Sequence, residues 1–562
     1  MELVILYVIV IVFLFIQNHF SSNKRKRKIL SRVREAWGKT PDNEFDDRDF
    51  DRFASFFNEY GKKNARFVMD DITWNDLEMD KLYARMNSTH TSTGDQLLYS
   101  ILRTPIYDEA VMEKRKRLID FWSINQNDRE RVQVELGRFG KYNDKGASVL
   151  LGQSDYLDLN DNKSFKIFTF LPLASALFIF INIGLGVLLV ILSIAFNIFY
   201  HERLYKEMEL KISAASSATA IIALAGRLVK LNPEGITEQT DLINNCYTRL
   251  KGALRKFSPS MFLLRSGDPM QDMADIPKMI FMTDIWSFDA SIRFLREKKE
   301  YLARMIEAIG IWDATISIAS FRESLKEWCV PEIVWNSTSE NDLYINAENV
   351  KHPMIKDCIG NPIHVKKPVL LTGSNASGKS TYLKIVVMNT ILAHSIMTCF
   401  AESWVSVPLF PITSIALRDN VINGESYFVA EIKSMRRIFQ SVNNEVRCLC
   451  IIDEVLRGTN TIERIAASSR IISALAALNT CVFAATHDVE LTGILKDKFE
   501  NKHFEETITN EDIRFDYLLK EGRATSRNAI KLLELMKFDT ELIQNCNEVV
   551  NDFEKTGRWE AI

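Results

Sequence analysis

Nine consecutive residues have the composition of a phosphate-binding loop: Gly373-Ser374-Asn375-Ala376-Ser377-Gly378-Lys379-Ser380-Thr381. A short apolar run, 368–371, precedes the loop, and residues 382–387 have the pattern of a helix start. A strand, a glycine-rich turn and a helix are the context that such a loop requires. Backbone N–H groups of the loop and of the helix N-terminus converge on one point and favour phosphate there. The sequence therefore predicts a nucleotide site at residues 373–381.

A second apolar run supplies acidic side chains for the same site, because residues 448–452 lead directly into Asp453 and Glu454. We expect Lys379 to pair with the β- and γ-phosphates of ATP, and Ser380 and Asp453 to hold Mg²⁺. Glu454 would lie near the γ-phosphate, where a carboxylate can orient and deprotonate the attacking water. The alternative is that the acidic pair is only a solvated strand end.

A third apolar run, 481–486, ends at His487. We expect His487 to reach the γ-phosphate as a sensor, whereas the alternative is a core or surface histidine that is satisfied elsewhere. Together the three runs predict an ATP hydrolase whose catalytic residues are Lys379, Glu454 and His487 and which requires ATP and Mg²⁺.

These segments resemble the ATPase domain of the MutS family of mismatch-repair proteins. The loop is similar to the family loop at Asn375 and at residues 378–381, and Ser374 stands where the family usually has proline. Three more stretches are similar to family motifs: residues 453–461 to Asp-Glu-x-x-Arg-Gly-Thr-x-Thr, residues 485–491 to Ala-Thr-His-x-x-Glu-Leu, and residues 424–431 to Gly-x-Ser-x-Phe-x-x-Glu.

The resemblance implies a composite site in a homodimer that forms through the ATPase domains. In the family, the serine of the last motif faces the γ-phosphate of the partner subunit, so Ser426 would act in trans. The pair His352-Pro353 matches the start of the family domain. The resemblance thus implies an α/β P-loop ATPase domain of the ABC type, similar to that of MutS, over residues 346–562.

The resemblance extends upstream to an all-α lever domain. Residues 74–105 are similar to the start of the family lever, and residues 311–319 to its return helix. We therefore expect the lever in two parts, 46–163 and 201–345. The family's N-terminal mismatch-reading domain and its Phe-x-Glu wedge have no counterpart, which argues against direct mismatch recognition.

The N-terminal apolar run, Leu3 to Ile16, predicts a first transmembrane helix over residues 1–20. A basic cluster, 23–28, follows this run, whereas a signal peptide would have its basic residues first. The positive-inside rule then places the N-terminus outside and the rest of the chain in the cytoplasm. Residues 21–45 are expected to be a basic linker. The alternative is a buried or interfacial N-terminal helix.

A second apolar block, 165–200, has a length suited to two membrane spans. Residues 182–186, Asn-Ile-Gly-Leu-Gly, would supply the turn of a helical hairpin, and basic residues flank the block on both sides. We therefore expect a multi-pass membrane protein with three spans, membrane lipid as a partner and a cytoplasmic ATPase domain. A soluble hydrophobic hairpin is the alternative.

Length, charge and cysteine content limit the number of domains, the binding partners and the redox chemistry that can be expected. The 562 residues predict two to three domains, and a net charge of −3 gives no overall basic signal for nucleic acid. The eight cysteines lack metal-ligand spacing and are expected to be reduced. The charged stretch Arg293 to Arg304 is either a solvated helix face or a DNA patch.

Three functions compete on these grounds. The first is a membrane-tethered MutS-like ATPase that acts on DNA or on a DNA-associated partner and is related to mismatch repair. The second is a mechanochemical ATPase that acts on membrane or protein partners without nucleic acid. The third, a transporter of the ABC type, would need more spans and a Leu-Ser-Gly-Gly-x signature, and the sequence has neither.

Overall fold

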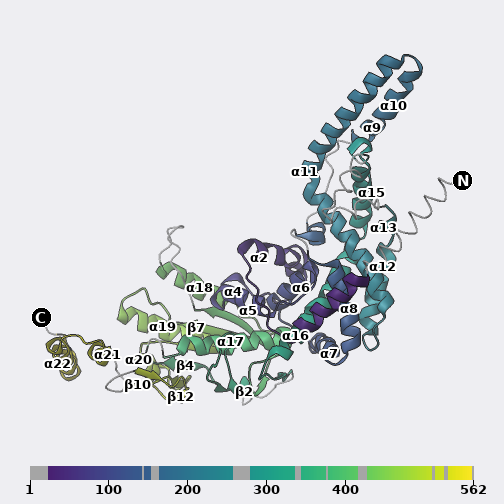
Figure 1. Cartoon of the computed structure of the whole chain (residues 1–562). Coiled ribbons are helices and arrows are strands. Elements are labelled where there is room, and N and C mark those ends of the chain that lie inside the picture. Colours follow the sequence, from purple (N-terminus) through teal and green to yellow (C-terminus); the bar gives the residue numbers. More distant parts are fainter. Residues whose placement is uncertain are drawn as a thin grey trace. The chain divides into compact units, whose positions relative to one another are not determined.

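The computed structural model describes residues 23–141, 145–152, 164–256, 277, 279–335, 343–374, 377–415, 427–508, 513–524 and 529–559. Some of the predictions fall outside the described residues: those for the first span, Ser426, Asn375 and Ala376. By its internal contacts the chain divides into two compact units. The helical unit comprises Met1–Val68, Tyr83–Thr104 and Glu113–Leu325, and the α/β unit comprises Met69–Leu82, Pro105–Met112 and Lys326–Ile562. Figure 1 labels the elements of both units.

The main sheet of the α/β unit has six described strands in the order β12-β9-β4-β8-β7-β6. Its strands are β4 (Val369–Thr372), β6 (Leu409–Ser414), β7 (Arg447–Asp453), β8 (Thr480–Ala485), β9 (Glu500–His503) and β12 (Lys520–Glu521). Neighbouring strands pair in parallel, except that β12 runs antiparallel to β9. All residues of β4 and β8 are buried, as is typical of parallel strands covered on both faces. The three apolar runs predicted as strands correspond to β4, β7 and β8.

Helices cover this sheet: α17 contacts β6, β7 and β8, α18 contacts β6, and α19 contacts β8 (Figure 1). The described helices of the unit are α4 (Asp71–Asp76), α17 (Lys379–Ile396), α18 (Tyr427–Ser441), α19 (Thr461–Ala476), α20 (Glu490–Ile494), α21 (Ala529–Leu535) and α22 (Thr540–Thr556). A second sheet has the order β1-β5-β2-β3, and a two-stranded ribbon pairs β10 with β11. These strands are β1 (Glu332–Ile333), β2 (Ile345–Val350), β3 (Asn361–Val365), β5 (Ser403–Ser406), β10 (Glu506–Ile508) and β11 (Ile513–Phe515).

A segment from the N-terminal half of the chain, Met69–Leu82, is built into the α/β unit. The buried carboxylate of Asp76 accepts hydrogen bonds from Thr413 Oγ1 at 2.6 Å and from Ile415 N at 2.9 Å. A buried carboxylate requires such partners, which ties α4 to the end of β6. The segment that resembles the start of the family lever therefore contributes α4 to the α/β unit.

Two helices of the helical unit, α6 (Ser92–Arg103) and α16 (Lys299–Ser324), pack closely on each other. α6 is buried along its whole length. The other described elements are α2 (Asp47–Phe53), η1 (Phe57–Gly61), α3 (Lys62–Asn64), α8 (Gln126–Phe139), η2 (Gly146–Leu151), α9 (Phe165–Phe168), α10 (Leu171–Leu177), η4 (Phe178–Phe180), α11 (Ile183–Leu231), α12 (Thr237–Leu250), α13 (Gly252–Lys256) and α15 (Thr283–Glu297). Two further helices, α5 (Met79–Met86) and α7 (Glu109–Ile124), carry the chain from one unit to the other. The predicted all-α character of this region is confirmed.

A buried carboxylate joins α16 to the start of α6. Asp313 accepts hydrogen bonds from His90 N at 2.9 Å, from Thr91 N at 2.8 Å and from Thr91 Oγ1 at 2.7 Å. Thr91 is the N-cap of α6, and its Oγ1 also accepts from Gly94 N at 2.9 Å. A Cβ on Gly94 would lie 2.2 Å from Asp313 Oδ2, so only glycine allows this approach. Burial raises the pKa of Asp313, and its hydrogen bonds oppose that shift.

Residues 165–200 form a helical hairpin in which α10 and η4 pack against α11 (Figure 1). The turn is shorter than the predicted 182–186, because α11 already begins at Ile183. The Asn182 side chain caps it by accepting from Leu185 N at 3.1 Å. A Cβ on Gly186 would lie 2.5 Å from Ile179 N, so the second glycine serves the close packing of the two arms.

The second arm of the hairpin is not a separate helix, since α11 continues for 49 residues as far as Leu231. Two of its segments are long and apolar enough to cross a membrane by length and composition, Ile183–Glu209 and Lys211–Leu231. The most apolar window is 17% buried in the first and 61% buried in the second. The second segment, rich in alanine and serine, is therefore core of the helical unit, where Ala215 and Ala218 are fully buried.

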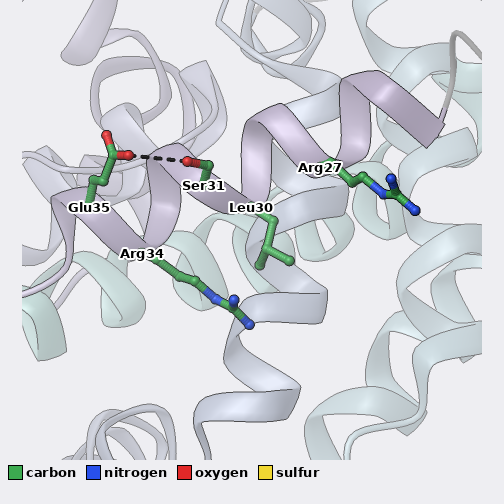
Figure 2. A pocket seen from close by; sticks show the side chains of 5 residues that line it. All are labelled: Arg27, Leu30, Ser31, Arg34 and Glu35. Atoms are coloured by element: carbon green, nitrogen blue, oxygen red, sulfur yellow. Dashed lines mark hydrogen bonds between the residues drawn. The ribbon is translucent and has the colours of Figure 1, made fainter.

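Residues 23–36, inside the predicted linker, form a helix. It is held to α8 by Arg34, whose Nη2 lies 2.7 Å from Glu130 Oε2, and by Lys26, whose Nζ lies 3.7 Å from Glu135 Oε1. Figure 2 shows Arg27, Leu30 and Arg34 along this helix. These side chains help to line a shallow cavity of about 310 Å³. Ser31 Oγ donates to Glu35 Oε1 at 3.1 Å on the same helix. The basic cluster therefore belongs to a packed helix.

Two other expectations concern charge and thiols. The stretch 293–304 is divided between α15 and α16, with Lys298 at the junction. Arg293 pairs with Asp289, and Lys298 Nζ donates to Arg249 O at 2.7 Å, so these two cations have intramolecular partners. All eight cysteines are free thiols, and Cys448 and Cys450 are buried on β7 as expected.

Candidate active site

The predicted site residues come from three adjacent strands of the main sheet. β4 pairs with β8 and β8 pairs with β7, all in parallel, and Ala485 lies opposite both Leu371 and Asp453. The carboxyl ends of these strands therefore meet at one edge of the sheet. Open α/β sheets bind their ligands at this edge.

The loop after β4 depends on glycine at both ends. Gly373 has φ +144°, and a Cβ there would lie 2.7 Å from Phe504 O. Gly378 has φ +108° and is the N-cap of α17. No side chain caps this helix start, so its first N–H groups are directed to the space beside the loop. Both glycines allow backbone conformations that other residues adopt only with strain.

Lys379 begins α17 and is 5% exposed. Its Nζ donates to two loop carbonyls, Gly373 O at 2.7 Å and Ser374 O at 2.8 Å. Burial lowers the pKa of Lys379, while the nearby Asp453 and Glu454 carboxylates oppose that shift. The ammonium group is therefore held inside the loop, beside both acidic residues.

Asp453 ends β7 and lies next to the first turn of α17. Burial raises the pKa of Asp453, and a hydrogen bond with the Ser380 side chain opposes the shift. One carboxylate and one hydroxyl thus lie within hydrogen-bond distance of each other, and hard oxygen ligands of this kind suit Mg²⁺. Among the described residues, no group of three or more His, Cys, Asp or Glu side chains that could hold a metal ion is found. Mg²⁺ is commonly held by one or two protein oxygens together with water and substrate phosphates, and the Ser380 and Asp453 side chains suit that role.

Glu454 follows in a left-handed backbone conformation, with φ +59°. Its Oε1 lies 2.8 Å from His487 Nε2, and its Oε2 lies 2.7 Å from Arg457 Nε. The hydrogen bond from His487 lowers the pKa of Glu454, and burial opposes this effect. The structure thus brings Glu454 and His487 together at the ends of β7 and β8.

A cavity of about 210 Å³ adjoins this pair. It is lined by Glu454, Val455, Arg457, Arg464, Thr486, His487 and Asp488. Arg464 of α19 pairs with Asp488 through two hydrogen bonds, at 2.6 Å and 2.9 Å. The sequence by itself indicated no role for Arg464. The available signal was Asp488, which directly follows His487 and whose carboxylate can accept two hydrogen bonds from one arginine.

Glu431 of α18 is a second residue whose role the sequence did not indicate. It is 2% exposed, and its carboxylate accepts from Arg457 N at 3.1 Å and from Gly458 N at 3.3 Å. Burial raises the pKa of Glu431, and the two backbone hydrogen bonds oppose that shift. It lies in the motif that contains Ser426, five positions further along the chain. This motif was the sequence signal that could have identified Glu431 as a residue of the site.

The strand order, the glycine-bounded loop and the acidic pair define an α/β domain of the nucleotide-binding type. Residues 369–554 match the family described as MutS domain V. The chain is 29% identical over 281 residues to the DNA mismatch repair protein MutS of Aquifex pyrophilus, covering 48% of this chain and 32% of that protein. It is 27% identical over 283 residues to that of Bacillus subtilis strain 168, covering 47% and 32%.

The MutS protein of Geobacillus strain WCH70 is also similar, at 27% identity over 295 residues, covering 48% of this chain and 33% of that protein. Over residues 369–554 the chain is therefore similar to domain V of MutS proteins. It matches about a third of the length of the curated relatives, and these matches cover about half of its own length.

Proposed function

We propose that the chain is a membrane-anchored ATPase of the MutS type that hydrolyses ATP in a dimer with composite sites. The convergence of Lys379, Asp453, Glu454 and His487 at the ends of three adjacent strands is the observation that carries this proposal. Lys379 Nζ, now bonded to two loop carbonyls, would pair with the β- and γ-phosphates. The loop N–H groups and the start of α17 would hold the remaining phosphate oxygens.

Ser380 and Asp453 are the residues that would hold Mg²⁺, which when bound neutralises phosphate charge. Glu454 is the base. The hydrogen bond from His487 lowers its pKa and so favours the carboxylate form, which accepts the proton of the attacking water. His487 and Arg457 orient the two carboxylate oxygens, one each. The position of His487 beside Glu454 supports its role as a γ-phosphate sensor.

The dimer follows from the family resemblance. Ser426, immediately before α18, would complete the site of the partner subunit, so that each ATP is enclosed by two chains. Turnover should therefore depend on protein concentration below the dissociation constant of the dimer.

The hairpin supports the membrane anchor. Its apolar side chains are exposed along both arms, and Phe180 and Ile181 near the tip are 89% and 80% exposed. An apolar surface of this extent is rare on a soluble monomer and marks a membrane or partner interface. The arm from Ile183 to Tyr200 is about 27 Å long at about 1.5 Å per residue, close to a hydrocarbon core of about 30 Å. The proposed topology has three spans, an outer N-terminus and a cytoplasmic ATPase domain.

The ATPase is proposed to act on DNA or on a DNA-associated partner, in keeping with the relatives named for DNA mismatch repair. The second candidate is mechanical work on membrane or protein partners without nucleic acid, which the exposed hairpin favours. Filter binding of the full chain in nanodiscs to duplex DNA, at several salt concentrations, separates the two. Affinity that falls steeply with salt supports the first, because phosphate contacts release counterions. No binding at low salt supports the second.

Hydrolysis of Mg·ATP by the same nanodisc preparation tests the proposed activity directly. Turnover should be present in the parent chain and should fall in Glu454→Gln by about a hundredfold or more. Equal rates in the parent chain and in Glu454→Gln would exclude Glu454 as the base.

A further inference from the structure

Two of the eight cysteines lie directly opposite each other in the α/β unit. Cys329 and Cys399 form an isolated antiparallel bridge, in which each backbone N–H donates to the carbonyl oxygen of the other residue at 2.9 Å. Residues that exchange both hydrogen bonds in this way have Cα atoms about 5.5 Å apart and side chains on the same face of the pair. That separation lies within the range of about 4.4–6.8 Å over which a disulfide joins two Cα atoms.

The two thiols differ in exposure and in acidity. Cys329 is half-buried, whereas Cys399 is 0% exposed. A side-chain hydrogen bond with Cys399 lowers the pKa of Cys329, and burial opposes this effect. The thiolate is the attacking form in thiol–disulfide exchange, so Cys329 is the thiol that a small molecule from solvent can meet in a reactive form. Cys399 is placed behind it, as a resolving thiol would be.

Cys399 is held firmly in the turn that follows α17. Asn389 of that helix donates through Nδ2 to Lys351 O at 3.0 Å and accepts through Oδ1 from Phe400 N at 2.7 Å. Phe400 O in turn accepts from Lys351 N at 2.7 Å. These bonds fix the backbone beside Cys399, so the sulfur of Cys399 is presented to Cys329 from a restrained position.

The segment that carries Cys329 has more freedom to adjust. It lies between the end of α16 at Ser324 and the start of β1 at Glu332, outside helices and strands. Opposite residues have Cβ atoms about 4.5–5.5 Å apart and a disulfide needs about 3.5–4.5 Å, so bond formation requires a closure of about 1 Å. A disulfide formed with such a closure is more easily reduced than an unstrained one, which makes it suited to reversible oxidation.

We propose that Cys329 and Cys399 are a reversible redox site that is oxidised by small-molecule disulfides of the glutathione class. The Cys329 thiolate attacks one sulfur of the small disulfide, which forms a mixed disulfide and releases one small thiolate. Cys399 then loses its proton to water and attacks Cys329 Sγ, which forms the Cys329–Cys399 bond and releases the second small thiolate. Two electrons pass from the protein to the small disulfide, and the two protons lost by the cysteines protonate the released thiolates.

The new bond would join two places of different origin in the chain. Cys329 lies just after Leu325, where the helical unit ends, and Cys399 lies just after α17, the helix that begins at the phosphate-binding loop. Oxidation therefore ties the segment that enters the α/β unit to the end of α17. This inference concerns thiol chemistry alone and does not depend on the proposed ATPase activity.

Oxidation of the folded full-length chain in nanodiscs tests the proposal. The protein is incubated with oxidised glutathione at neutral pH, its remaining thiols are alkylated, and its peptides are analysed by mass spectrometry without reduction. We expect a cross-linked peptide pair that contains Cys329 and Cys399, with the loss of both free thiols, and recovery of both on addition of dithiothreitol. The proposal is overturned if Cys329 remains reduced or if its oxidation stops at the mixed disulfide.

Two variants assign the roles of the two thiols. Cys399→Ser removes the resolving thiol, so the glutathione adduct of Cys329 should accumulate. Cys329→Ser removes the attacking thiol, so the buried Cys399 should remain reduced. Equal oxidation of Cys399 in Cys329→Ser and in the parent chain would contradict the assignment. Cys358→Ser, which removes another half-buried thiol of the same unit, is the matched control and should leave the yield of the cross-link unchanged.

Unfolding would also expose cysteines to the oxidant, and the same digests separate this case from the proposed chemistry. Cys246 and Cys481 are buried in the helical unit and in β8, so both should remain reduced while the Cys329–Cys399 bond forms. Oxidation of all four cysteines at one rate would show that the reaction occurs in the unfolded chain and would refute the site.

Discussion

The Nε2 atom of His487 lies 2.8 Å from Oε1 of Glu454, at the ends of the adjacent parallel strands β8 and β7. Arg457 occupies the other oxygen, with its Nε 2.7 Å from Oε2. Each oxygen of the carboxylate therefore has its own N–H donor, which restrains its orientation. A carboxylate held in this way is suited to orient the attacking water.

Replacing Glu454 with glutamine should retain ATP binding while turnover falls by about 10²- to 10⁴-fold, the range for loss of a general base. Because ATP would bind without being cleaved, the dimer should accumulate, which light scattering in the presence of Mg·ATP can measure. Glu402→Gln, which alters an exposed carboxylate just before β5, is the control and should turn over normally. A monomeric, fully active Glu454→Gln protein would contradict both the expected loss of turnover and the expected accumulation of the dimer.

Replacing Lys379 with alanine should weaken ATP binding by roughly 10- to 100-fold, because charge-assisted hydrogen bonds contribute about 1.5–3 kcal/mol. Titration with a fluorescent ATP analogue measures this change. The exposed Lys367, just before β4, provides the control Lys367→Ala, which removes the same charge outside the loop. Similar affinities for the two variants would argue against phosphate binding by Lys379.

Acidification should destabilise the α/β unit through His394. Burial lowers the pKa of His394 from 6.5 to about 4. Its Nε2 accepts from Leu409 N at 3.3 Å, and its ring lies 4.9 Å from that of Tyr107. Between these pH values the unfolded chain binds the proton more strongly, so stability falls as pH decreases from about 6.5 to about 4, by about 3 kcal/mol at most.

The comparison of His394→Gln with the parent chain isolates this effect. Since other groups also titrate, the measured quantity is the difference in the free energy of unfolding, followed by denaturant titration from pH 7 to pH 4. The variant should lose less stability than the parent over this range. His364→Gln, an exposed histidine on β3, should preserve the parental pH dependence. Identical pH profiles for the parent and His394→Gln would refute the assignment.

Replacing Asp313 with alanine should destabilise the helical unit by about 3 kcal/mol or more, because it leaves buried N–H and O–H donors of His90 and Thr91 without an acceptor. Asp313→Asn keeps one acceptor oxygen and should cost less. Thermal unfolding in detergent measures the loss of stability in both variants. If the two variants unfolded at the parental temperature, the carboxylate would not be the link between α16 and α6.

Replacing Gly186 with valine should separate the arms of the hairpin by roughly 1–2 Å, the range over which side chains alter the distance between helix axes. The reason is the approach of Ile179, whose backbone a Cβ would meet at 2.5 Å. Spin labels at the exposed positions Leu173 and Ile191 measure the separation. Gly184→Val is the control, since a Cβ there meets only Asn182 Oδ1, at 3.6 Å. Equal distances in the two variants would contradict the predicted packing.

Much of the candidate site could be predicted because its parts follow apolar runs. Asp453 and His487 come at or just after a strand end, and Lys379 follows the loop after β4; parallel strands bring such ends to one edge of a sheet. The partner of a side chain could not be predicted in the same way. The bonds from Arg457 and Gly458 to Glu431 span 26 and 27 residues and depend on how α18 packs, which no local pattern encodes.

By itself the sequence determined the local chemistry: a glycine-bounded loop, an acidic pair after a buried strand, and apolar blocks too long for an ordinary surface helix. These features depend on residue types and on short spacings along the chain, so each can be recognised from neighbouring residues. Only the tertiary structure decided that Met69–Leu82 packs into the α/β unit, that α11 runs unbroken from the hairpin into the helical core, and that residues 23–36 form a packed helix. The first and the third of these outcomes arise because buried polar groups such as Asp76 and Glu130 must find partners, and their partners lie far away along the chain.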